Sequence, residues 1–424
     1  MLQIYRFLTI VFFPLFVVLI LFRKIIGKED SVRFKEKIYP TDYGLHKNSD
    51  ENLIWFHGAS IGEITSVIPI INEFIKNKKI KILITTTTLS SGKMVDQEFK
   101  NNTQIFHRYF PIDVIFIIKK FLNIWKPKLI ILIDSEIWPN LIFEIKKKKI
   151  NLILINGRIT EKTFKKWNIF KKVSKKIFES FDLCLASSKE SFEYLKHLGA
   201  NNVKYEGNLK FCAKVNNTKK LDAEKLLQLE KRRVWCATST HEGEEKFCMD
   251  VHKIIKKTYT DILTIIIPRH IIRTKDIFKQ SQKLGLKSQI LNKDDKIEEG
   301  VDLIIINSYG LLSKYYDYCK SVFIGKSIIE KLKPVGGQNP IEAARYGCKV
   351  YHGPFVYNFK EVYEYLNNKD ICFQIEDKND LAKKIILDLQ ETKIKNLKNI
   401  EKIHNIGDKI LEQTINEISN YNKL

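Results

Sequence analysis

Apolar, strand-like runs alternate with helical patterns along most of this chain, and this alternation restricts the fold more than any other feature. The expected strands are Leu53–Phe56, Ile80–Thr85, Leu129–Ile133, Leu152–Ile155, Leu183–Ala186, Val203–Tyr205, Val234–Ala237, Ile262–Ile267, Ser288–Leu291, Leu303–Ile306, Ser321–Ile324 and Lys349–Tyr351. Repeated strand–helix units are typical of parallel sheets. The sequence therefore predicts an α/β fold of two Rossmann-like domains that face each other across a cleft, with ligands bound at the carboxyl ends of the strands.

The length of 424 residues, 44% of them apolar, exceeds what one α/β domain usually needs. The pattern turns polar after Lys210 and restarts at Val234. We expect a membrane anchor over 1–28, a first domain over 29–215, a linker over 216–231, a second domain over 232–400 and a last helix over 401–424. The last helix is expected to cross back to the first domain.

The chain carries 72 Lys and Arg against 49 Asp and Glu, a formal charge of +23. Such an excess favours a polyanionic partner, either nucleic acid, an acidic lipid surface or a phosphorylated substrate. Lysine is abundant throughout, as an AT-rich coding bias would produce, so part of the excess carries no functional message. Seven scattered cysteines without a Cys-x-x-Cys spacing predict reduced thiols in the cytosol and no structural zinc.

The N-terminus contains an uncharged apolar run from Phe7 to Phe22. The run is slightly shorter than the roughly 20 residues that a spanning helix needs. No small-residue cleavage site follows it, and Arg23, Lys24 and Lys28 favour retention on the cytoplasmic side. We therefore expect a single N-terminal anchor in the inner membrane, spanning or re-entrant, rather than a cleaved signal peptide.

Two glycine-containing loops, His57–Glu63 and Gly336–Glu342, each follow an apolar strand and open a helix. Backbone N–H groups at a helix amino terminus lack intrahelical partners, and the helix dipole is positive there. Glycines let a phosphate or carboxylate approach these groups. Both loops are therefore candidate anion sites.

In the first half, the candidate site residues are Glu63, Glu136 and Lys210. Glu63 lies in a first helical turn, where the dipole keeps the carboxylate ionised and weakens it as a base; alternatively it only caps the helix. Glu136 follows the strand Leu129–Ile133, where α/β enzymes place site residues, although a capping role is equally compatible with the spacing. Lys210 stands out from other lysines only by its position before the linker.

In the second half, three segments follow strand ends: 239–245, 268–270 and 336–342. Asn339 and Pro340 are expected at a helix start whose N–H groups point at a nucleotide phosphate, with Glu342 accepting from ribose hydroxyls. Arg269 can supply a fixed positive charge. His241 and His270 are more often structural than catalytic, and neither has metal-ligand spacing.

Taken together, these strings resemble the 3-deoxy-D-manno-octulosonic acid (Kdo) transferases of lipopolysaccharide assembly over nearly the whole chain. The matching strings are Trp55-Phe-His57, Ser60-Ile-Gly-Glu63, Ser135-Glu-Ile-Trp-Pro-Asn140, Asn156-Gly-Arg158, Gly207-Asn-Leu-Lys-Phe211, Ser239-Thr-His-Glu-Gly-Glu-Glu245, Pro268-Arg-His270, Gly337-Gln-Asn-Pro-Ile-Glu342 and Gly353-Pro354. The resemblance implies a glycosyltransferase B-type fold, a CMP-Kdo donor and a lipid A precursor, lipid IVA, as acceptor. It also implies inverting transfer without a metal or another cofactor.

Carried over to these positions, the resemblance makes Glu63 the proton acceptor and makes Glu136 and Lys210 the groups that stabilise the transition state. It assigns CMP binding to Pro268, Arg269, Tyr309, Gly310, Leu311, Asn339, Pro340, Ile341 and Glu342. The chain departs from the family pattern at Leu311, where a glutamate is usual, and at Cys212, Ala343 and Phe355. These departures predict altered nucleotide contacts and unchanged catalytic groups.

Residues 141–180 hold twelve Lys and Arg against three Glu, with Phe164, Trp167, Phe170 and Ile177 at helix-like spacing. This stretch could lie on an anionic inner-membrane surface, or it could be a crossover helix that packs on the sheet. Two other functions compete with Kdo transfer. A UDP-sugar transferase or epimerase could have the same architecture, whereas a nucleic-acid-binding module is motivated by charge alone and lacks any recognisable motif.

Overall fold

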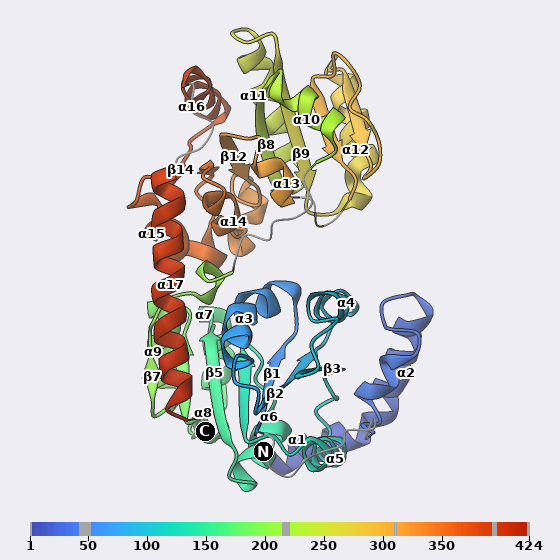
Figure 1. Ribbon diagram of the computed structural model, residues 1–424, viewed down its shortest axis with the longest axis vertical. Helices are drawn as coiled ribbons and strands as arrows, with labels where there is room; N and C mark the ends of the chain where they lie inside the picture. Colours follow the sequence, from blue (N-terminus) through green and yellow to red (C-terminus); the bar gives the residue numbers. More distant parts are fainter. Residues whose placement is uncertain are drawn as a thin grey trace. The chain divides into compact units, whose positions relative to one another are not determined.

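The computed structural model describes residues 2–41, 52–213, 221–308, 310, 312–391 and 397–421. By contacts between residues, the chain divides into two compact units (Figure 1). Unit 1 comprises Met1–Lys214 together with Ile406–Leu424, and unit 2 comprises Val215–Asn405. The end of the chain thus belongs to the same unit as its beginning.

Unit 1 is built on a parallel sheet with the strand order β3-β2-β1-β4-β5-β6-β7. Its strands are β1 (Asn52–Gly58), β2 (Ile80–Thr86), β3 (Ile105–Tyr109), β4 (Leu129–Ile133), β5 (Asn151–Gly157), β6 (Leu183–Ala186) and β7 (Val203–Lys204). Central strands such as β4 are buried along their whole length. Continuous Ile and Leu runs suit a parallel sheet that is covered on both faces.

Four of the α-helices of unit 1 begin at Ser or Thr caps that the sequence supplies. The helices of unit 1 are α1 (Leu2–Val11), α2 (Phe13–Ile25), η1 (Arg33–Lys37), α3 (Ile61–Phe74), α4 (Leu89–Glu98), α5 (Ile115–Trp125), α6 (Pro139–Lys147), α7 (Glu161–Ile169), α8 (Lys171–Phe178), α9 (Lys189–His197) and η2 (Leu209–Phe211). Ser60, Thr88, Thr160 and Ser188 are N-caps whose side chains accept hydrogen bonds from the first turns of α3, α4, α7 and α9.

Unit 2 repeats this plan with the strand order β10-β11-β9-β8-β12-β13-β14, again parallel throughout. Its strands are β8 (Arg233–Thr240), β9 (Ile262–Pro268), β10 (Ser288–Leu291), β11 (Leu303–Ile306), β12 (Ser321–Ile324), β13 (Lys349–His352) and β14 (Cys372–Gln374). The helices are α10 (Ala223–Glu230), α11 (Glu244–Lys256), η3 (Ile271–Arg273), α12 (Thr274–Lys283), α13 (Leu312–Tyr316), η4 (Glu330–Val335), α14 (Ile341–Arg345), η5 (Tyr357–Phe359), α15 (Lys360–Asn367) and α16 (Lys378–Gln390). The predicted α/β class with two parallel-sheet domains is confirmed.

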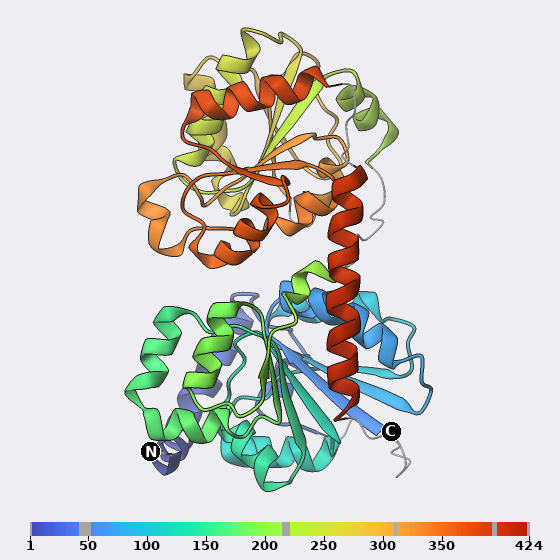
Figure 2. The ribbon, with the colours of Figure 1, turned by 90° about the vertical axis from the view of Figure 1, so that its left-hand side faces the viewer.

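The last helix, α17 (Leu397–Ser419), is the long red helix in Figure 2. Beyond Ile406 it packs on unit 1, where Tyr421 accepts a hydrogen bond from Asn151 at 2.9 Å and Glu417 pairs with Lys204 at 2.6 Å. Gly407 lies against η2: a Cβ at this position would be 2.2 Å from the carbonyl oxygen of Phe211. Only glycine allows this close approach between α17 and η2.

The apolar N-terminal segment consists of two helices rather than one. α1 and α2 meet at Phe12 with a bend of 53°. Within the described residues no single helix has the length and apolar character of a membrane span, although the bent pair together meets both criteria. The segment expected to form the anchor is thus divided between two helices, and the anchor itself, spanning or re-entrant, stays a prediction. Pro14, in the first turn of α2, lacks the N–H group that would continue the hydrogen bonds of α1.

The basic stretch at 141–180 is divided among α6, β5, α7 and α8. Three of the four apolar side chains named for this stretch face protein: Phe164 stacks on Tyr194 with ring centroids 4.4 Å apart, Trp167 meets Phe178 edge-on at 5.6 Å, and Ile177 is buried, whereas Phe170 is exposed. This packing favours the crossover alternative, because side chains that fill the core cannot enter a bilayer.

Candidate functional site

The three candidate catalytic residues gather at one edge of the unit 1 sheet. Glu63 lies in the first turn after β1, and Glu136 follows β4, the neighbouring strand. From β1 the chain adds β2 and β3 on one side of β1, and it then adds β4 on the other side of β1. Such a switch point creates a crevice at the carboxyl ends of parallel strands. Lys210 lies on η2, which packs against α3, the helix that carries Glu63.

Glu63 caps its own helix, and each oxygen of its carboxylate accepts one hydrogen bond. Ser60 Oγ donates to Oε1 at 2.6 Å, and the N–H of Ala59 donates to Oε2 at 2.7 Å. The carboxylate is not saturated, since a carboxylate has about four lone-pair sites. Both the capping and the candidate catalytic interpretation are thus compatible with this geometry.

The pKa of Glu63 is raised above its ordinary value, mainly by burial and further by the neighbouring charges of Asp134 and Glu136, against the lowering effect of Ser60 and Ala59. Burial and the nearby carboxylates thus oppose the lowering of the Glu63 pKa that is expected from the helix dipole. A raised pKa makes the carboxylate a better proton acceptor.

Glu136 is held by two side chains, one from the end of β1 and one from the N-cap of α6. Its Oε2 lies 3.0 Å from Nε2 of His57 and accepts a hydrogen bond from the indole N–H of Trp138 at 2.8 Å. Burial raises the pKa of Glu136, but the hydrogen bond and charge of His57, and then Trp138, outweigh burial and leave the pKa below its ordinary value. Glu136 therefore stays anionic beside Glu63.

His57 is a positioning residue. In the sequence it stands out only as part of Trp55-Phe-His57 and of the loop His57–Glu63. Its ring is fully buried, stacks on Phe110 with centroids 3.7 Å apart, and places Nδ1 2.9 Å from Thr85 Oγ1. Because both ring nitrogens have partners, the orientation of the imidazole is fixed. The only signal in the sequence was its place at the end of β1, next to the glycine loop.

Lys210 is positioned by two asparagines. Asn208 accepts from the N–H of Lys210 at 3.0 Å, and Asn156, at the end of β5, accepts from the N–H of Leu209 at 3.0 Å. Asn156 adopts a positive φ of 51°, a conformation that asparagine tolerates better than most residues. Burial lowers the pKa of Lys210, and the charge of Arg158 lowers it further, while Asp134 and Glu63 act in the opposite direction.

In unit 2, Pro268 ends β9 and Arg269 follows it with an exposed side chain. Asn339 and Pro340 lie before α14, and Asn339 Oδ1 accepts from the N–H of Ile341 at 3.1 Å. Pro340 is the N-cap rather than a first-turn residue, so α14 begins one residue later than predicted. The N–H group of Ile341, the first of the helix, is already bound by Asn339. Ile341 is buried and Glu342 is exposed in the first turn of this short helix.

The predicted turn 309–311 is described only at Gly310, which is exposed and has a φ of 77°. Tyr309 and Leu311 lie outside the described residues. A backbone in the left-handed region at Gly310 is consistent with a tight turn, for which glycine is the natural residue.

Cationic side chains gather at the switch point of unit 2, between β8 and β12. Arg269 follows β9 and Lys326 follows β12. Burial and then the charges of Lys326 and Arg269 lower the pKa of His241, whose ring lies 5.9 Å from that of His270, so the fixed charges here are those of Arg269 and Lys326. Burial lowers the pKa of Lys326, and the charge of Arg269 lowers it further. Lys326 also has a φ of 61°, which costs a residue with a Cβ about 1–2 kcal/mol. An anion bound here would relieve the mutual repulsion of these charges.

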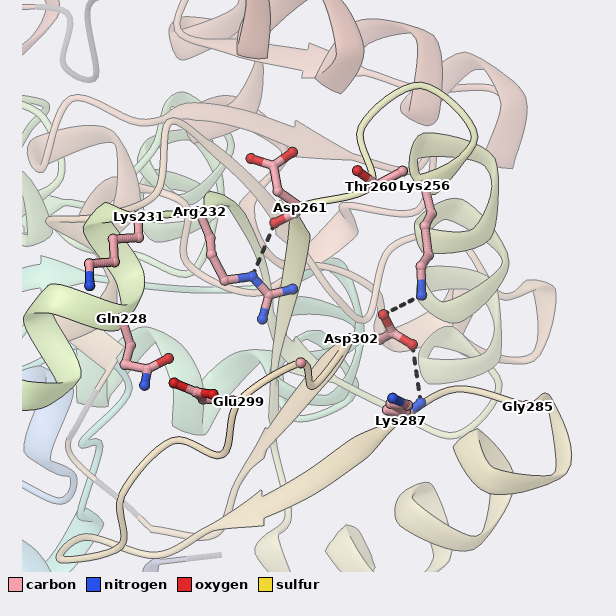
Figure 3. Close-up of a pocket in the computed structure, with 11 residues that line it drawn as sticks. Gln228, Lys231, Arg232, Lys256, Thr260, Asp261, Gly285, Lys287, Glu299 and Asp302 are labelled. Atoms are coloured by element: carbon pink, nitrogen blue, oxygen red, sulfur yellow. Dashed lines mark hydrogen bonds and ion pairs between the residues drawn. The ribbon is translucent and has the colours of Figure 1, made fainter.

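A separate cavity of about 570 Å³ lies at the opposite edge of the unit 2 sheet (Figure 3). Its lining includes Arg232, Asp261, Lys287 and Asp302, which precede β8, β9, β10 and β11. Arg232 donates to the carbonyl oxygens of Asp261 and Ile262, and Lys256 pairs with Asp302 at 2.5 Å. The cavity contains none of the predicted nucleotide residues, and three of its charged side chains, Arg232, Lys256 and Asp302, already have protein partners.

The described ranges contain no group of three or more His, Cys, Asp or Glu side chains that could hold a metal ion. All seven cysteines are buried as free thiols. Burial raises the pKa of Cys184, Cys248 and Cys372, among others, so these sulfurs are protonated and unreactive.

Comparison with known proteins identifies residues 33–213 as a match to the family model "3-Deoxy-D-manno-octulosonic-acid transferase (kdotransferase)". The matched segment contains Glu63, Glu136 and Lys210. A 3-deoxy-D-manno-octulosonic acid transferase from Rickettsia bellii is 29% identical over 99% of this chain and 100% of its own length. An enzyme of the same name from Haemophilus influenzae is 25% identical over 90% of this chain and 88% of its own.

Solved structures with a similar fold include UDP-GlcNAc 2-epimerase from Neisseria meningitidis bound to UDP-GlcNAc, with a TM-score of 0.57 and 14% identity over 87% of this chain and 99% of that one. A second structure of a UDP-N-acetylglucosamine 2-epimerase has a TM-score of 0.59 and 13% identity, and covers 88% of this chain and 96% of its own. At these identities the likeness concerns the fold alone.

Proposed function

Because the chain belongs to the 3-deoxy-D-manno-octulosonic acid (Kdo) transferase family, we propose that it is a glycosyltransferase that moves Kdo from CMP-Kdo to a hydroxyl of lipid IVA with inversion. Unit 1 binds the lipid acceptor and unit 2 binds the cytidylate. The observation that carries this proposal is the convergence of Glu63, Glu136 and Lys210 at the β1–β4 switch point, inside the segment that matches the family.

Glu63 is the general base in this proposal. The acceptor O–H gives its proton to a lone pair of the Glu63 carboxylate, the oxygen forms a bond to the anomeric carbon of Kdo, and the bond between that carbon and the CMP phosphate breaks. The electron pair leaves on the phosphate. The raised pKa of Glu63 and the two bonds that fix its carboxylate support this role.

Glu136 and Lys210 stabilise the charges that develop in the transition state. The anomeric carbon gains oxocarbenium character, which an anionic Glu136 favours, and the leaving phosphate gains negative charge, which Lys210 favours. Lys210 is half-buried, and burial lowers its pKa; charge–charge attraction is stronger where water is partly excluded. The proposal assigns the positive charge at the phosphate to side chains instead of a bound metal.

Arg269, Asn339 and Glu342, with the neighbouring residues Pro268, Gly310, Pro340 and Ile341, contact the nucleotide in this proposal. The cations at the β8–β12 switch point support it, because the phosphate of CMP carries negative charge. Tyr309 and Leu311 are proposed on the family resemblance alone. The protein acts at the inner membrane with its catalytic units on the cytoplasmic side, and its excess of positive charge draws it to anionic lipid rather than to nucleic acid.

The test is a transfer assay with CMP-Kdo and lipid IVA in mixed micelles, in which the product is read by mass. Glu63→Gln keeps the shape of the side chain and removes the base, so the transfer rate should fall by about 10²–10⁴-fold while CMP still binds. Glu73→Gln is the matched control, since Glu73 lies on the same helix and its exposed side chain pairs with Lys76 at 2.6 Å. Glu73→Gln should leave the rate unchanged.

Two outcomes would overturn the proposal. Full activity of Glu63→Gln would show that another group takes the proton. Turnover of UDP-N-acetylglucosamine without any reaction of CMP-Kdo would place the chain with the UDP-sugar enzymes whose fold it resembles.

A further inference from the structure

The first two helices expose an extended apolar surface. Its side chains belong to Ile4, Phe7, Leu8, Ile10, Val11, Phe12, Leu15, Val18, Leu19, Leu21, Phe22, Ile25 and Ile26. The exposed fraction reaches 64% at Phe7 and 81% at Ile25. In Figure 1, α2 stands clear of the unit 1 sheet, whereas α1 lies beside α5, with which it is in contact. Apolar surface of this extent marks a place that a partner or a membrane covers.

The beginning of this segment is fastened to the body of unit 1 by polar contacts. Tyr5 donates to Asp113 at 2.9 Å, Arg6 donates to Glu144 at 3.1 Å, and Asn140 donates to Thr9 at 3.3 Å. Asp113, Glu144 and Asn140 are all buried. Pulling α1 away would therefore break hydrogen bonds to three buried side chains.

The end of the segment is fastened to the same unit. Glu29, buried, accepts from Arg23 at 2.7 Å and from Lys37 at 2.5 Å, and Lys37 also donates to the carbonyl oxygen of Thr87 at 2.8 Å. Arg33 pairs with Asp96 at 2.9 Å in α4. These contacts hold the chain after α2 against the β2–α4 connection.

The residues between these two attachments are too few to cross a bilayer. Residues 10–22 would span about 20 Å as a straight helix, at ~1.5 Å per residue, whereas the hydrocarbon core is roughly 30 Å thick. The bend of 53° at Phe12 shortens the reach further. A segment with both ends on one domain and this length can enter a membrane only from one side.

The charges around the segment indicate which occupant covers the apolar surface. Residues 2–28 contain no acidic side chain, and Arg23, Lys24 and Lys28 follow the apolar run. A second copy of the chain would bring the same cations against these cations. Anionic lipid headgroups instead complement them while the acyl chains cover the apolar side chains.

We propose that α1 and α2 form an in-plane anchor, which enters one leaflet of an anionic bilayer and leaves it on the same side, so that both ends of the segment lie with unit 1. Asp113, which holds Tyr5, follows β3 at the sheet edge that also carries Glu63 and Glu136. If the proposed function holds, this anchor brings the catalytic edge to the surface where the lipid acceptor lies. The anchor itself does not depend on that function.

Single cysteines test the topology in the full-length chain. Gln3 and Lys28 are exposed on either side of the segment, and the native cysteines are buried, so Gln3→Cys and Lys28→Cys can be labelled selectively with a membrane-impermeant maleimide. In inverted inner-membrane vesicles both positions should react, as should Asn420→Cys, an exposed marker on unit 1. In intact spheroplasts all three should stay unlabelled. A Gln3→Cys that reacts only in spheroplasts would show a spanning helix and overturn the proposal.

The occupant is tested separately by charge insertion. Phe22→Asp should shift the protein from the membrane fraction to the supernatant and abolish its sedimentation with vesicles that contain phosphatidylglycerol. Leu387→Asp is the control, because Leu387 is an exposed leucine on α16 in unit 2, and it should leave sedimentation unchanged. If Phe22→Asp instead dissociates a dimer and leaves vesicle binding intact, a second copy covers the surface and the proposal is wrong. Circular dichroism of each variant establishes that it is folded.

Discussion

The two units place a glutamate at the same point of the same architecture and use it differently. Glu63 lies in the first turn after β1 in unit 1, and Glu244 lies in the first turn after β8 in unit 2. Burial raises the pKa of both side chains. Glu63 accepts one hydrogen bond on each oxygen, whereas Glu244 accepts two on each, from the N–H groups of His241, Lys326, Ser327 and Ile328.

This difference separates a structural carboxylate from one that can do chemistry. The lone pairs of Glu244 are all occupied, and the residue is fully buried, so it ties the β8 loop to the β12 loop and cannot accept another proton donor. Glu63 is partly exposed and keeps free lone pairs beside two further carboxylates, Asp134 and Glu136. At the equivalent edge of unit 2 the surrounding groups are instead the cations Arg269 and Lys326. These surroundings support the proposal that unit 1 takes a proton and unit 2 holds an anion.

The largest expected effect comes from Glu244→Gln. The Gln side chain presents an NH₂ group to two of the four backbone N–H donors, which therefore lose their acceptor. The hydrogen bonds to the remaining oxygen are no longer assisted by a charge. We expect the free energy of unfolding to fall by about 3 kcal/mol or more. Denaturant unfolding followed by far-UV circular dichroism measures it. Glu242→Gln, in the same loop but exposed, is the control and should unfold as the unaltered chain does.

Glu63→Gln should show the opposite combination, with lost transfer and little loss of stability. A large loss of stability in Glu63→Gln, or an unaltered stability in Glu244→Gln, would contradict the comparison between the two units.

The second expected effect concerns the anion site of unit 2. Arg269→Gln and Lys326→Gln each remove a positive charge, and CMP affinity should fall by about tenfold or more for each, since hydrogen bonds to charged groups contribute about 1.5–3 kcal/mol. Isothermal titration with CMP measures the loss. The weakening should shrink as salt concentration rises, because salt screens exposed charges.

Lys275→Gln is the control for this measurement. Lys275 is exposed on α12 in the same unit, so the variant changes net charge by the same amount without altering the proposed site. Equal weakening by Lys275→Gln would mean that CMP responds to overall charge, and the cationic site of unit 2 would lose its basis.

Most strands whose bounds the sequence predicts lie inside their sheets. The predicted bounds of β4, β6, β11 and β12 match the structure, because a buried parallel strand needs an uninterrupted apolar run. The bounds of the edge strand β10 also match, whereas the edge strands β3 and β14 were not predicted. An edge strand is covered less completely and tolerates polar side chains, as His107 and Arg108 in β3 show, so its sequence carries a weaker signal.

The site was predictable as a set of positions and not as a set of interactions. The ends of β1 and β4 identify Glu63 and Glu136, since α/β sheets bring ligands to strand ends. The pairing of His57 with Glu136 joins residues 79 positions apart, and only the strand order brings them together. The direction of the Glu63 pKa shift also depends on burial, which no local pattern specifies.

The smallest effect is the sharpest test of Glu63 as a base. Since Glu63 must be ionised to accept a proton and burial raises its pKa, the acid limb of kcat/KM should lie above the ordinary glutamate value of 4.5. The hydroxyl of Ser60 donates to the carboxylate and lowers that pKa. Ser60→Ala removes this donor, so the acid limb should move to still higher pH, by roughly one unit or less if the bond contributes about 1 kcal/mol.

Ser60→Ala also removes the N-cap of α3, so a control must lose a cap without touching Glu63. Ser188→Ala does this at α9, where Ser188 accepts from the N–H of Ser191 at 3.0 Å. Both variants should lose about 1 kcal/mol of stability. Only Ser60→Ala should shift the pH profile, because only there does the hydroxyl hold the carboxylate that takes the proton. If the limb stayed in place in both variants, some group other than Glu63 would set it, and the distinction between a working glutamate in unit 1 and a structural one in unit 2 would fail.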